Sequence, residues 1–171
     1  MKIGIISDTH GFLDPKVFHY FKDCDQVWHS GDIGSSAVTD ALKEKFDLKA
    51  VFGNIDGGSL RVEFNEDLIF TVEGKKIFIT HIAGKPYAYN KRVSDLLKTH
   101  QPDILVCGHS HILRVEFDKK YNTLFINPGA AGIHGFHKVK TLIRFEITAN
   151  EIKNMQAIEM GPRVEKKATE N

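Results

Sequence analysis

The sequence predicts a single α/β domain that contains two sheets. In the first third of the chain, short apolar runs rich in β-branched residues alternate with segments that carry helix signals, which is typical of parallel strands joined by crossovers. The second half contains more strand patterns and more turn signals. The length of 171 residues fits one domain at residues 1–161, followed by a charged tail at residues 162–171 that we expect to fray.

The first third is expected to hold three strands and two helices. Asp14 suits the N-cap of the first helix and Pro15 its first helical position, while Ser35 or Ser36 can cap the second helix. The expected elements are a strand at residues 2–7, a helix ending near residue 23, a strand at 25–30, a helix ending near residue 45 and a strand at 48–52.

The middle of the chain changes to a hairpin that is followed by a helix. Apolar runs at residues 68–72 and 76–80 flank Glu73-Gly74, a turn signal. A helix is expected at residues 90–100, where Gln101-Pro102 ends it. The remaining expected strands cover residues 103–107, 113–117, 123–126, 140–147 and 151–160. These patterns predict a parallel-rich half followed by an antiparallel half.

Composition excludes several classes of protein. A hydrophobic fraction of 42% and a charged fraction of 26% argue against disorder. The net charge of +1 provides no basic field, so nucleic acid is not expected as a partner. No apolar run approaches the ~18 residues of a membrane helix, and no signal peptide is evident, so we expect a cytoplasmic protein that does not bind membranes. Cys24 and Cys107 are expected to be free thiols.

Polar residues follow five of the predicted strands. Ligand sites in α/β sheets lie outside the carboxyl ends of strands, so we expect these side chains to converge. The residues are Asp8 and His10, Asp32, Asn54 and Asp56, His81, and His109 and His111. Gly31, Gly53 and Gly108 each precede one of them, where a glycine allows unusual dihedrals and close packing.

The residue types in this cluster suit divalent metal ions. Carboxylates, imidazoles and one amide, with no thiolate, fit Mn²⁺, Fe, Zn²⁺, Ni²⁺ or Co²⁺ rather than a structural zinc, and we favour manganese. Seven donors, the set above without Asp56, are too many for one tetrahedral ion. They predict two ions about 3.5–4 Å apart that share one carboxylate.

In this order and spacing, the motifs resemble those of the calcineurin-like metallophosphoesterases. Asn127-Pro128-Gly129 after the Gly-His-Ser-His motif is similar to the compact bacterial and archaeal phosphodiesterase branch, and the resemblance extends to about residue 158. It implies a four-layer α/β/β/α sandwich of two mixed sheets. Members of the family often form dimers or tetramers, so the resemblance is compatible with a homo-oligomer.

The resemblance also implies roles for the ligands. One ion would be held by Asp8, His10, Asp32 and His111, and the other by Asp32, Asn54, His81 and His109. Asp32 would bridge the ions, and a hydroxide held between them would attack phosphorus in line. The residues expected to act in catalysis are Asp32, Asn54, Asp56 and His81.

One position departs from the family pattern. Many members carry a histidine after the asparagine that protonates the leaving group, and this chain has Ile55, which cannot donate a proton. General acid catalysis is worth ~10²–10⁴ in rate, so esters with poor leaving groups should suffer most. Asp56 is the nearest titratable replacement, although its role in the motif is a supporting one.

A glycine-rich loop from Gly129 to Lys140 follows the last motif. One interpretation is a flexible loop whose His134, His137 and Lys138 bind substrate; the alternative is a tight connection with a solvated basic turn. His29 is expected either in the core or behind the ligands.

The expected function is a dinuclear metal-dependent phosphodiesterase acting on a small phosphoester. The alternatives are a phosphomonoesterase or nucleotide phosphatase, and a non-catalytic scaffold of the same fold. A eukaryotic retromer subunit resembles this family and also has an apolar residue after the asparagine, but its ligand set is eroded. The complete set of seven donors in this chain favours an enzyme.

Overall fold

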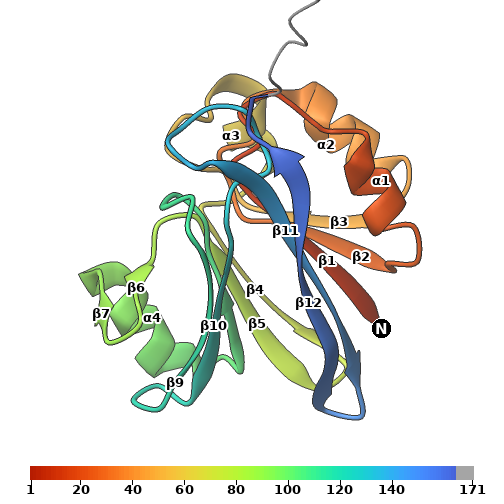
Figure 1. The fold of residues 1–171 in the computed structure, drawn as a ribbon. Coiled ribbons are helices and arrows are strands. Elements are labelled where there is room, and N and C mark those ends of the chain that lie inside the picture. The colour runs from red at the N-terminus through yellow and green to blue at the C-terminus, as the bar shows by residue number, and fades with distance from the viewer. Residues whose placement is uncertain (165–171) are drawn as a thin grey trace, which may run out of the picture.

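The computed structural model describes residues 1–164 and contains two five-stranded sheets packed face to face (Figure 1). The first sheet has the order β12-β11-β1-β2-β3 and the second the order β4-β5-β8-β10-β9. The first sheet comprises β1 (Lys2–Ile6), β2 (Gln26–His29), β3 (Asp47–Ala50), β11 (Val139–Thr148) and β12 (Glu151–Pro162). The second comprises β4 (Asp67–Val72), β5 (Lys75–Thr80), β8 (Ile104–Val106), β9 (Leu113–Asp118) and β10 (Thr123–Pro128).

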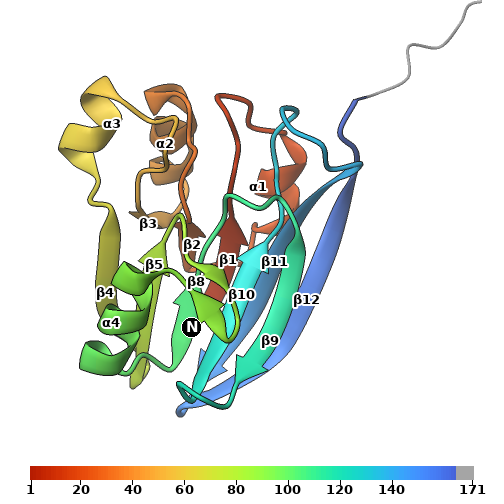
Figure 2. The same cartoon turned by 90° about the vertical axis from the view of Figure 1, so that its left-hand side faces the viewer.

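Helices cover the outer faces of both sheets, so the expected four-layer α/β/β/α sandwich is confirmed (Figures 1 and 2). The helices are α1 (Lys16–Tyr20), α2 (Ser36–Lys43), α3 (Gly58–Glu63) and α4 (Lys91–His100). Ile3, Trp28 and Ile79 belong to the apolar cluster between the sheets. Val38 of α2 packs against the outer face of the first sheet, and Val93 of α4 against that of the second.

The expected parallel-rich first half is confirmed in β1, β2 and β3, but the second half is not wholly antiparallel. β11 returns to the first sheet and lies antiparallel beside β1, pairing Glu146 with Lys2. In the second sheet β8 runs parallel to both β5 and β10. Burial explains the return of β11: its Ile143 and Phe145 enter the central cluster, while Leu142 enters the cluster under the helices. A strand that is apolar on both faces belongs inside a sheet rather than at its edge.

The predicted helix starts are largely confirmed. The Ser35 side chain accepts a hydrogen bond from the Ala37 amide, and the Asn90 side chain accepts one from the Val93 amide. The first helix differs from its prediction: Asp14 accepts a hydrogen bond from the Lys16 amide, but the N-cap of α1 is Pro15 rather than Asp14, and α1 ends at Tyr20 rather than near residue 23. The helix α3 and the short strands β6 (Gly84–Lys85) and β7 (Ala88–Tyr89) were not expected.

The first residues of the expected charged tail contact the domain. Pro162 is the last residue of β12, and Arg163 donates hydrogen bonds to the carbonyls of Ile133 and His137 at 3.0 Å each. The rest of the predicted tail, residues 165–171, lies outside the described residues. Cys24 and Cys107 are free, as expected.

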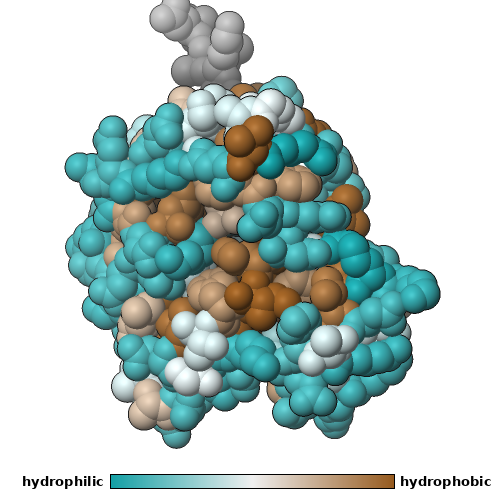
Figure 3. Space-filling model, turned by 180° about the vertical axis from the view of Figure 1, so that it is seen from behind, coloured by the Kyte–Doolittle hydropathy of each residue, from teal (hydrophilic) through white to brown (hydrophobic). Residues whose placement is uncertain are grey.

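The edge strands β3 and β4 lie on the side of the molecule that faces away from the viewer in Figure 1 (Figure 2). Seen from behind, the molecule shows apolar side chains gathered near its centre, with hydrophilic ones around them (Figure 3). Leu68 and Phe70 of β4 are only partly buried against the central cluster. No helix of residues 1–164 is long and apolar enough to span a membrane.

Candidate metal centre

The seven predicted ligands converge because five strands end at the same side of the sandwich. β1, β2 and β3 run parallel, and so do β5 and β8 in the other sheet. The loops that follow are joined by backbone hydrogen bonds, such as those from the His10 amide to the Asp32 carbonyl and from the Gly108 amide to the His81 carbonyl, both 3.0 Å. The His109 amide donates to the Asp8 carboxylate at 3.1 Å and connects the two sheets.

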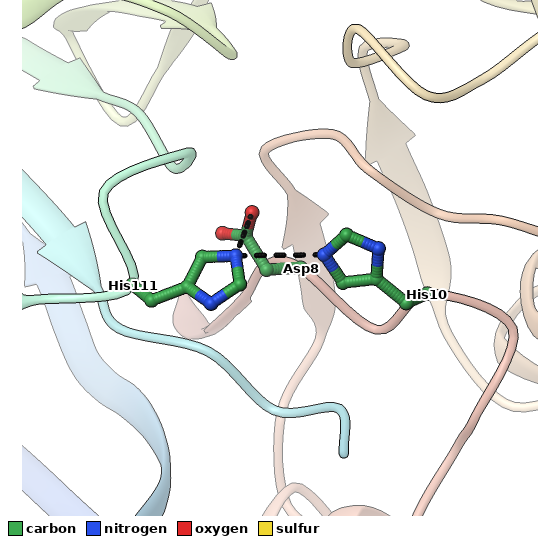
Figure 4. Close-up of side chains that lie close together, drawn as sticks. All are labelled: Asp8, His10 and His111. Atoms are coloured by element: carbon green, nitrogen blue, oxygen red, sulfur yellow. Dashed lines mark hydrogen bonds and ion pairs between the residues drawn. The ribbon is translucent and has the colours of Figure 1, made fainter. Parts of the chain in front are cut away.

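The first cluster consists of Asp8, His10 and His111, whose ligand atoms lie within 4.8 Å of one another (Figure 4). The Nε2 atom of His111 is 3.2 Å from Oδ1 of Asp8 and 3.4 Å from Nε2 of His10. Asp8 is fully buried, and both imidazoles are partly buried. Two ring nitrogens and a carboxylate oxygen therefore face one point from segments on opposite sheets.

The second cluster consists of Asp32, His81 and His109, and Asn54 extends it. Nε2 of His81 lies 3.2 Å from Oδ1 of Asp32 and 3.1 Å from Oδ1 of Asn54. The rings of His81 and His109 meet edge to face, with centroids 5.3 Å apart. Asn54 and His109 are exposed, so this cluster is open to solvent on one side.

Asp32 lies between the two clusters. Its Oδ1 atom faces His81, and its Oδ2 atom is 3.8 Å from Nε2 of His10 in the first cluster. A carboxylate in this position can contact two ions at once, as the shared ligand of a dinuclear site does. The nitrogen and oxygen donors suit divalent transition metals.

Hydrogen bonds behind the ligands orient two of the imidazoles. His137 pairs with the Gly132 carbonyl through Nε2 at 3.0 Å, so its Nδ1 can accept from Nδ1 of His111 at 3.3 Å. Nε2 of His111 is thereby directed at the Asp8 carboxylate, 3.2 Å away. His81 likewise pairs with the Ser30 carbonyl through Nδ1 at 2.8 Å, and such partners are typical of metal-bound histidines.

Electrostatics in the second cluster are also consistent with a metal site. Burial would lower the pKa of His81, but its hydrogen bond to Asp32 and the nearby carboxylates outweigh this and raise the pKa. Burial would raise the pKa of Asp32, but the hydrogen bonds from His81 and the Ile55 amide lower it. When no metal is bound, a proton on His81 forms a hydrogen bond to the Asp32 carboxylate, and a metal ion must displace that proton in order to bind.

Five of the seven predicted ligands have a strained backbone. A positive φ is costly for residues other than glycine and is typical of functional sites. The residues and their φ values are Asp8 (54°), His10 (48°), Asp32 (51°), His109 (66°) and His111 (56°). Nothing in the sequence pattern revealed this strain.

Glycine is needed before the ligands for two different reasons. Gly31 has a φ of +97°, which other residues rarely adopt. Gly53 and Gly108 do not have positive φ values; instead a Cβ at Gly53 would lie 2.1 Å from Oδ1 of Asp32, and one at Gly108 would lie 2.1 Å from Oγ of Ser7. These two positions require close approach rather than unusual dihedrals.

Asp56 and His29 support the ligands from behind. The buried Asp56 carboxylate accepts hydrogen bonds from three backbone amides, those of Ile33, Gly34 and Gly53. It joins the loops that carry Asp32 and Asn54, which fits a supporting role rather than the expected catalytic one. His29 is fully buried, accepts from the Gly31 amide and pairs with Oγ1 of Thr9 at 2.9 Å.

The loop from Gly129 to Lys140 divides into parts with different roles. His134 is exposed, and its ring centroid lies 5.9 Å from that of His10; Lys138 is also exposed. His137 is buried behind His111, so the structure places it as a positioning residue rather than at the surface that substrate would reach. Lys140 is buried and forms a 2.6 Å ion pair with Asp14, so its charge is already neutralised.

Two arginines beside the second cluster were not predicted from the sequence. Arg61 of α3 and Arg92 of α4 line a cavity of about 160 Å³ together with Asn54 and His81. Arg61 was missed because it lies in a helix that was not expected, although it follows Asp56 by only five residues. Phe136 was missed as well, although its ring stacks on His111 with centroids 5.7 Å apart.

Comparisons with known proteins agree with this geometry. A probable metallophosphoesterase of Methanocaldococcus jannaschii is 32% identical over 139 residues, which make up 76% of this chain and 68% of that protein. A phosphodiesterase of the same organism is 32% identical over 146 residues, or 75% of this chain and 83% of that protein. The solved structure of a novel archaeal phosphodiesterase is 26% identical with a TM-score of 0.75, covering 94% of this chain and all of that one.

The family follows from a match that spans most of the chain. Residues 1–150 match the calcineurin-like phosphoesterase superfamily domain. Fold, ligand clusters and relatives are consistent with that match, and the chain therefore belongs to the calcineurin-like phosphoesterase superfamily.

Proposed function

We propose that this protein is a dinuclear metal-dependent phosphodiesterase that hydrolyses a small phosphoester. The observation that carries the proposal is the position of Asp32, one oxygen of which faces each of the two ligand clusters. Asp8, His10, Asp32 and His111 would hold one ion, and Asp32, Asn54, His81 and His109 the other. Two divalent ions in these places would supply an activated water and neutralise charge on the phosphoryl oxygens.

The protein's own residues would contribute orientation and exclusion of solvent. His137 and the Ser30 carbonyl fix the rings of His111 and His81, and Asp56 joins the loops that carry Asp32 and Asn54. Rigid placement of this kind lets the site hold substrate and water in a reactive geometry. His134 and Lys138 are exposed beside the first cluster or in the same loop, and we propose that they contact the substrate phosphate.

We favour a diester over a monoester partly because one cation of the glycine-rich loop is already neutralised. A monoester carries one more negative charge and needs more cations around it. Lys140, one of the two lysines in the glycine-rich loop, is neutralised by Asp14 and unavailable for this purpose.

The test is hydrolysis of bis-p-nitrophenyl phosphate with Mn²⁺, together with elemental analysis of the protein. We expect about two ions per chain and steady turnover. Asp32→Asn keeps the shape of the side chain but removes its charge, and should reduce turnover by more than the ~10–100-fold typical of residues that only support ligands. Asp95→Asn, at an exposed position on α4, is the matched control and should leave both readings unchanged.

Two outcomes would contradict the proposal in different ways. Fewer than one ion per chain after purification from metal-replete medium would favour a scaffold of the same fold. Two ions without diester turnover, tested with Mn²⁺, Ni²⁺, Co²⁺ and Zn²⁺ in turn, would exclude the phosphodiesterase.

A further inference from the structure

A small cavity adjoins the second ligand cluster, and two cations line it. The cavity measures about 160 Å³, and its walls include Asn54 and His81 from the cluster, Arg61 from α3, and Arg92 from α4 together with its ion-pair partner Glu66. A group that reaches Asn54 and His81 from this side therefore meets both guanidinium groups. The two arginines differ in what they already bind.

Arg61 is held in place by uncharged partners. Its Nε atom donates to the Asp56 carbonyl and its NH2 atom to the Gly53 carbonyl at 3.4 Å. Its guanidinium group lies over the Phe52 ring, with Cζ 4.3 Å from the centroid. These three contacts orient the side chain against the loop that carries Asn54 and Ile55.

The charge of Arg61 is not neutralised by the protein. No carboxylate among residues 1–164 lies within ion-pair distance of it, whereas Arg92 forms ion pairs with Asp67 and, at 3.3 Å, with Glu66. A guanidinium group has five N–H donors and stays protonated in proteins. Two donors of Arg61 are used by carbonyls, so three remain for a ligand, and an anion is the ligand that its charge favours.

We propose that Arg61 is a catalytic residue that binds the leaving-group oxygen of the phosphodiester. The inference rests on the proposed function. The leaving oxygen becomes negative as its bond to phosphorus breaks, and it needs either a proton or a positive charge nearby. Ile55 can supply neither, and Arg61 is the cation whose two carbonyl partners, Gly53 and Asp56, flank Asn54 and Ile55 on the same loop.

The step balances without a proton from the protein. A water oxygen forms a bond to phosphorus, and the bond from phosphorus to the ester oxygen breaks, leaving both electrons on that oxygen. Arg61 donates a hydrogen bond to the departing oxygen and keeps its proton. The water loses one proton to solvent and the departing alcohol gains one from solvent, so the sum is addition of one water molecule.

The experiment measures how the rate depends on the leaving group. The substrates are methyl aryl phosphates whose phenols range from p-nitrophenol to unsubstituted phenol, assayed as kcat/KM with Mn²⁺. Arg61→Met should reduce the rate for the phenyl ester on the order of 100-fold, as loss of one donor to a developing oxyanion does. For the p-nitrophenyl ester, whose phenolate is already stable, the loss should be less than about threefold, so the rate depends more steeply on the leaving group.

Arg92→Met is the matched control, because Arg92 lines the same cavity but is neutralised by Asp67 and Glu66. Its leaving-group dependence should equal that of the unaltered protein. Arg61→Lys keeps the charge without the planar fork and should give an intermediate dependence. Elemental analysis of each variant should still find two ions per chain.

The outcomes separate the inference from the function on which it rests. If Arg61→Met lowers kcat/KM equally for every ester, Arg61 only holds the loop in place and the inference is overturned. An unchanged dependence of kcat/KM on the leaving group would overturn it as well. A steeper profile in Arg92→Met as well would show that the effect is not specific to Arg61 and would also overturn it. If the unaltered protein hydrolyses none of the esters, the proposed function fails and the inference fails with it.

Discussion

Backbone strain at the ligands can be measured by comparing two substitutions of His109. This residue has a φ of 66° and an exposed side chain. His109→Ala and His109→Gly both remove the imidazole, and both keep the amide that donates to Asp8. The two variants differ only in the cost of the left-handed conformation and in the freedom of the unfolded chain.

The expected difference follows from two opposing effects. The left-handed conformation costs a residue with a Cβ roughly 1–2 kcal/mol, and glycine escapes this cost. Glycine also loses more conformational freedom on folding, which costs about 0.5–1 kcal/mol. Strain is the larger effect, so His109→Gly should be more stable than His109→Ala by about 0.5–1 kcal/mol.

Urea denaturation of the chelator-treated proteins provides the measurement. Ser110, the next residue, does not have a positive φ and serves as the control. Ser110→Gly should be less stable than Ser110→Ala, because only the entropic effect remains. If His109→Gly is no more stable than His109→Ala, or if both positions give the same order, the strain argument is wrong.

The remaining predictions concern buried charges. Lys140→Met leaves Asp14 buried without its partner and should cost about 3–5 kcal/mol, which lowers the melting temperature on the order of 10 °C. Burial raises the pKa of Asp14, but the hydrogen bonds and charges of Lys140 and Lys16 together outweigh burial and lower the pKa, so the ionised form supports folding at neutral pH and this support fades as the pH falls through the folded pKa. The cost of Lys140→Met should therefore shrink in acid; a cost independent of pH would contradict the pairing. Burial lowers the pKa of His29 from 6.5 to about 4, so stability should fall as the pH drops from about 6.5 towards 4, by up to ~1.4 kcal/mol per pH unit. His29→Gln should flatten this part of a urea-midpoint profile, and an unchanged slope would show that His29 does not titrate there.

Local signals in the sequence predicted the parts of the fold that depend on neighbouring residues. Ser35 and Asn90 cap helices where expected, and Glu73-Gly74 joins the two strands of a hairpin. The ligands at strand ends could be placed because parallel strands of one sheet present their carboxyl ends on the same side. Neither inference depends on the order of the strands in the sheet.

Features that depend on distant contacts could not be predicted in the same way. β11 lies beside β1 because burial on both of its faces decides its place, and the apolar pattern alone does not name a partner. The same limit applies to the ion pair between Lys140 and Asp14, whose residues lie 126 positions apart in the sequence. Arg61 was missed because Gly57-Gly58 weakens the helix signal of α3.

The return of β11 to β1 also affects when the metal centre can form during synthesis. His10 and His111 are 101 residues apart in the chain, and translation at about 5–20 residues per second separates them by roughly 5–20 s. β1 gains its antiparallel neighbour later still, when Glu146 has left the ribosome. A nascent chain therefore presents Asp8 and His10 long before the rest of their cluster exists, and the complete set of donors is available only after His111 has been synthesised.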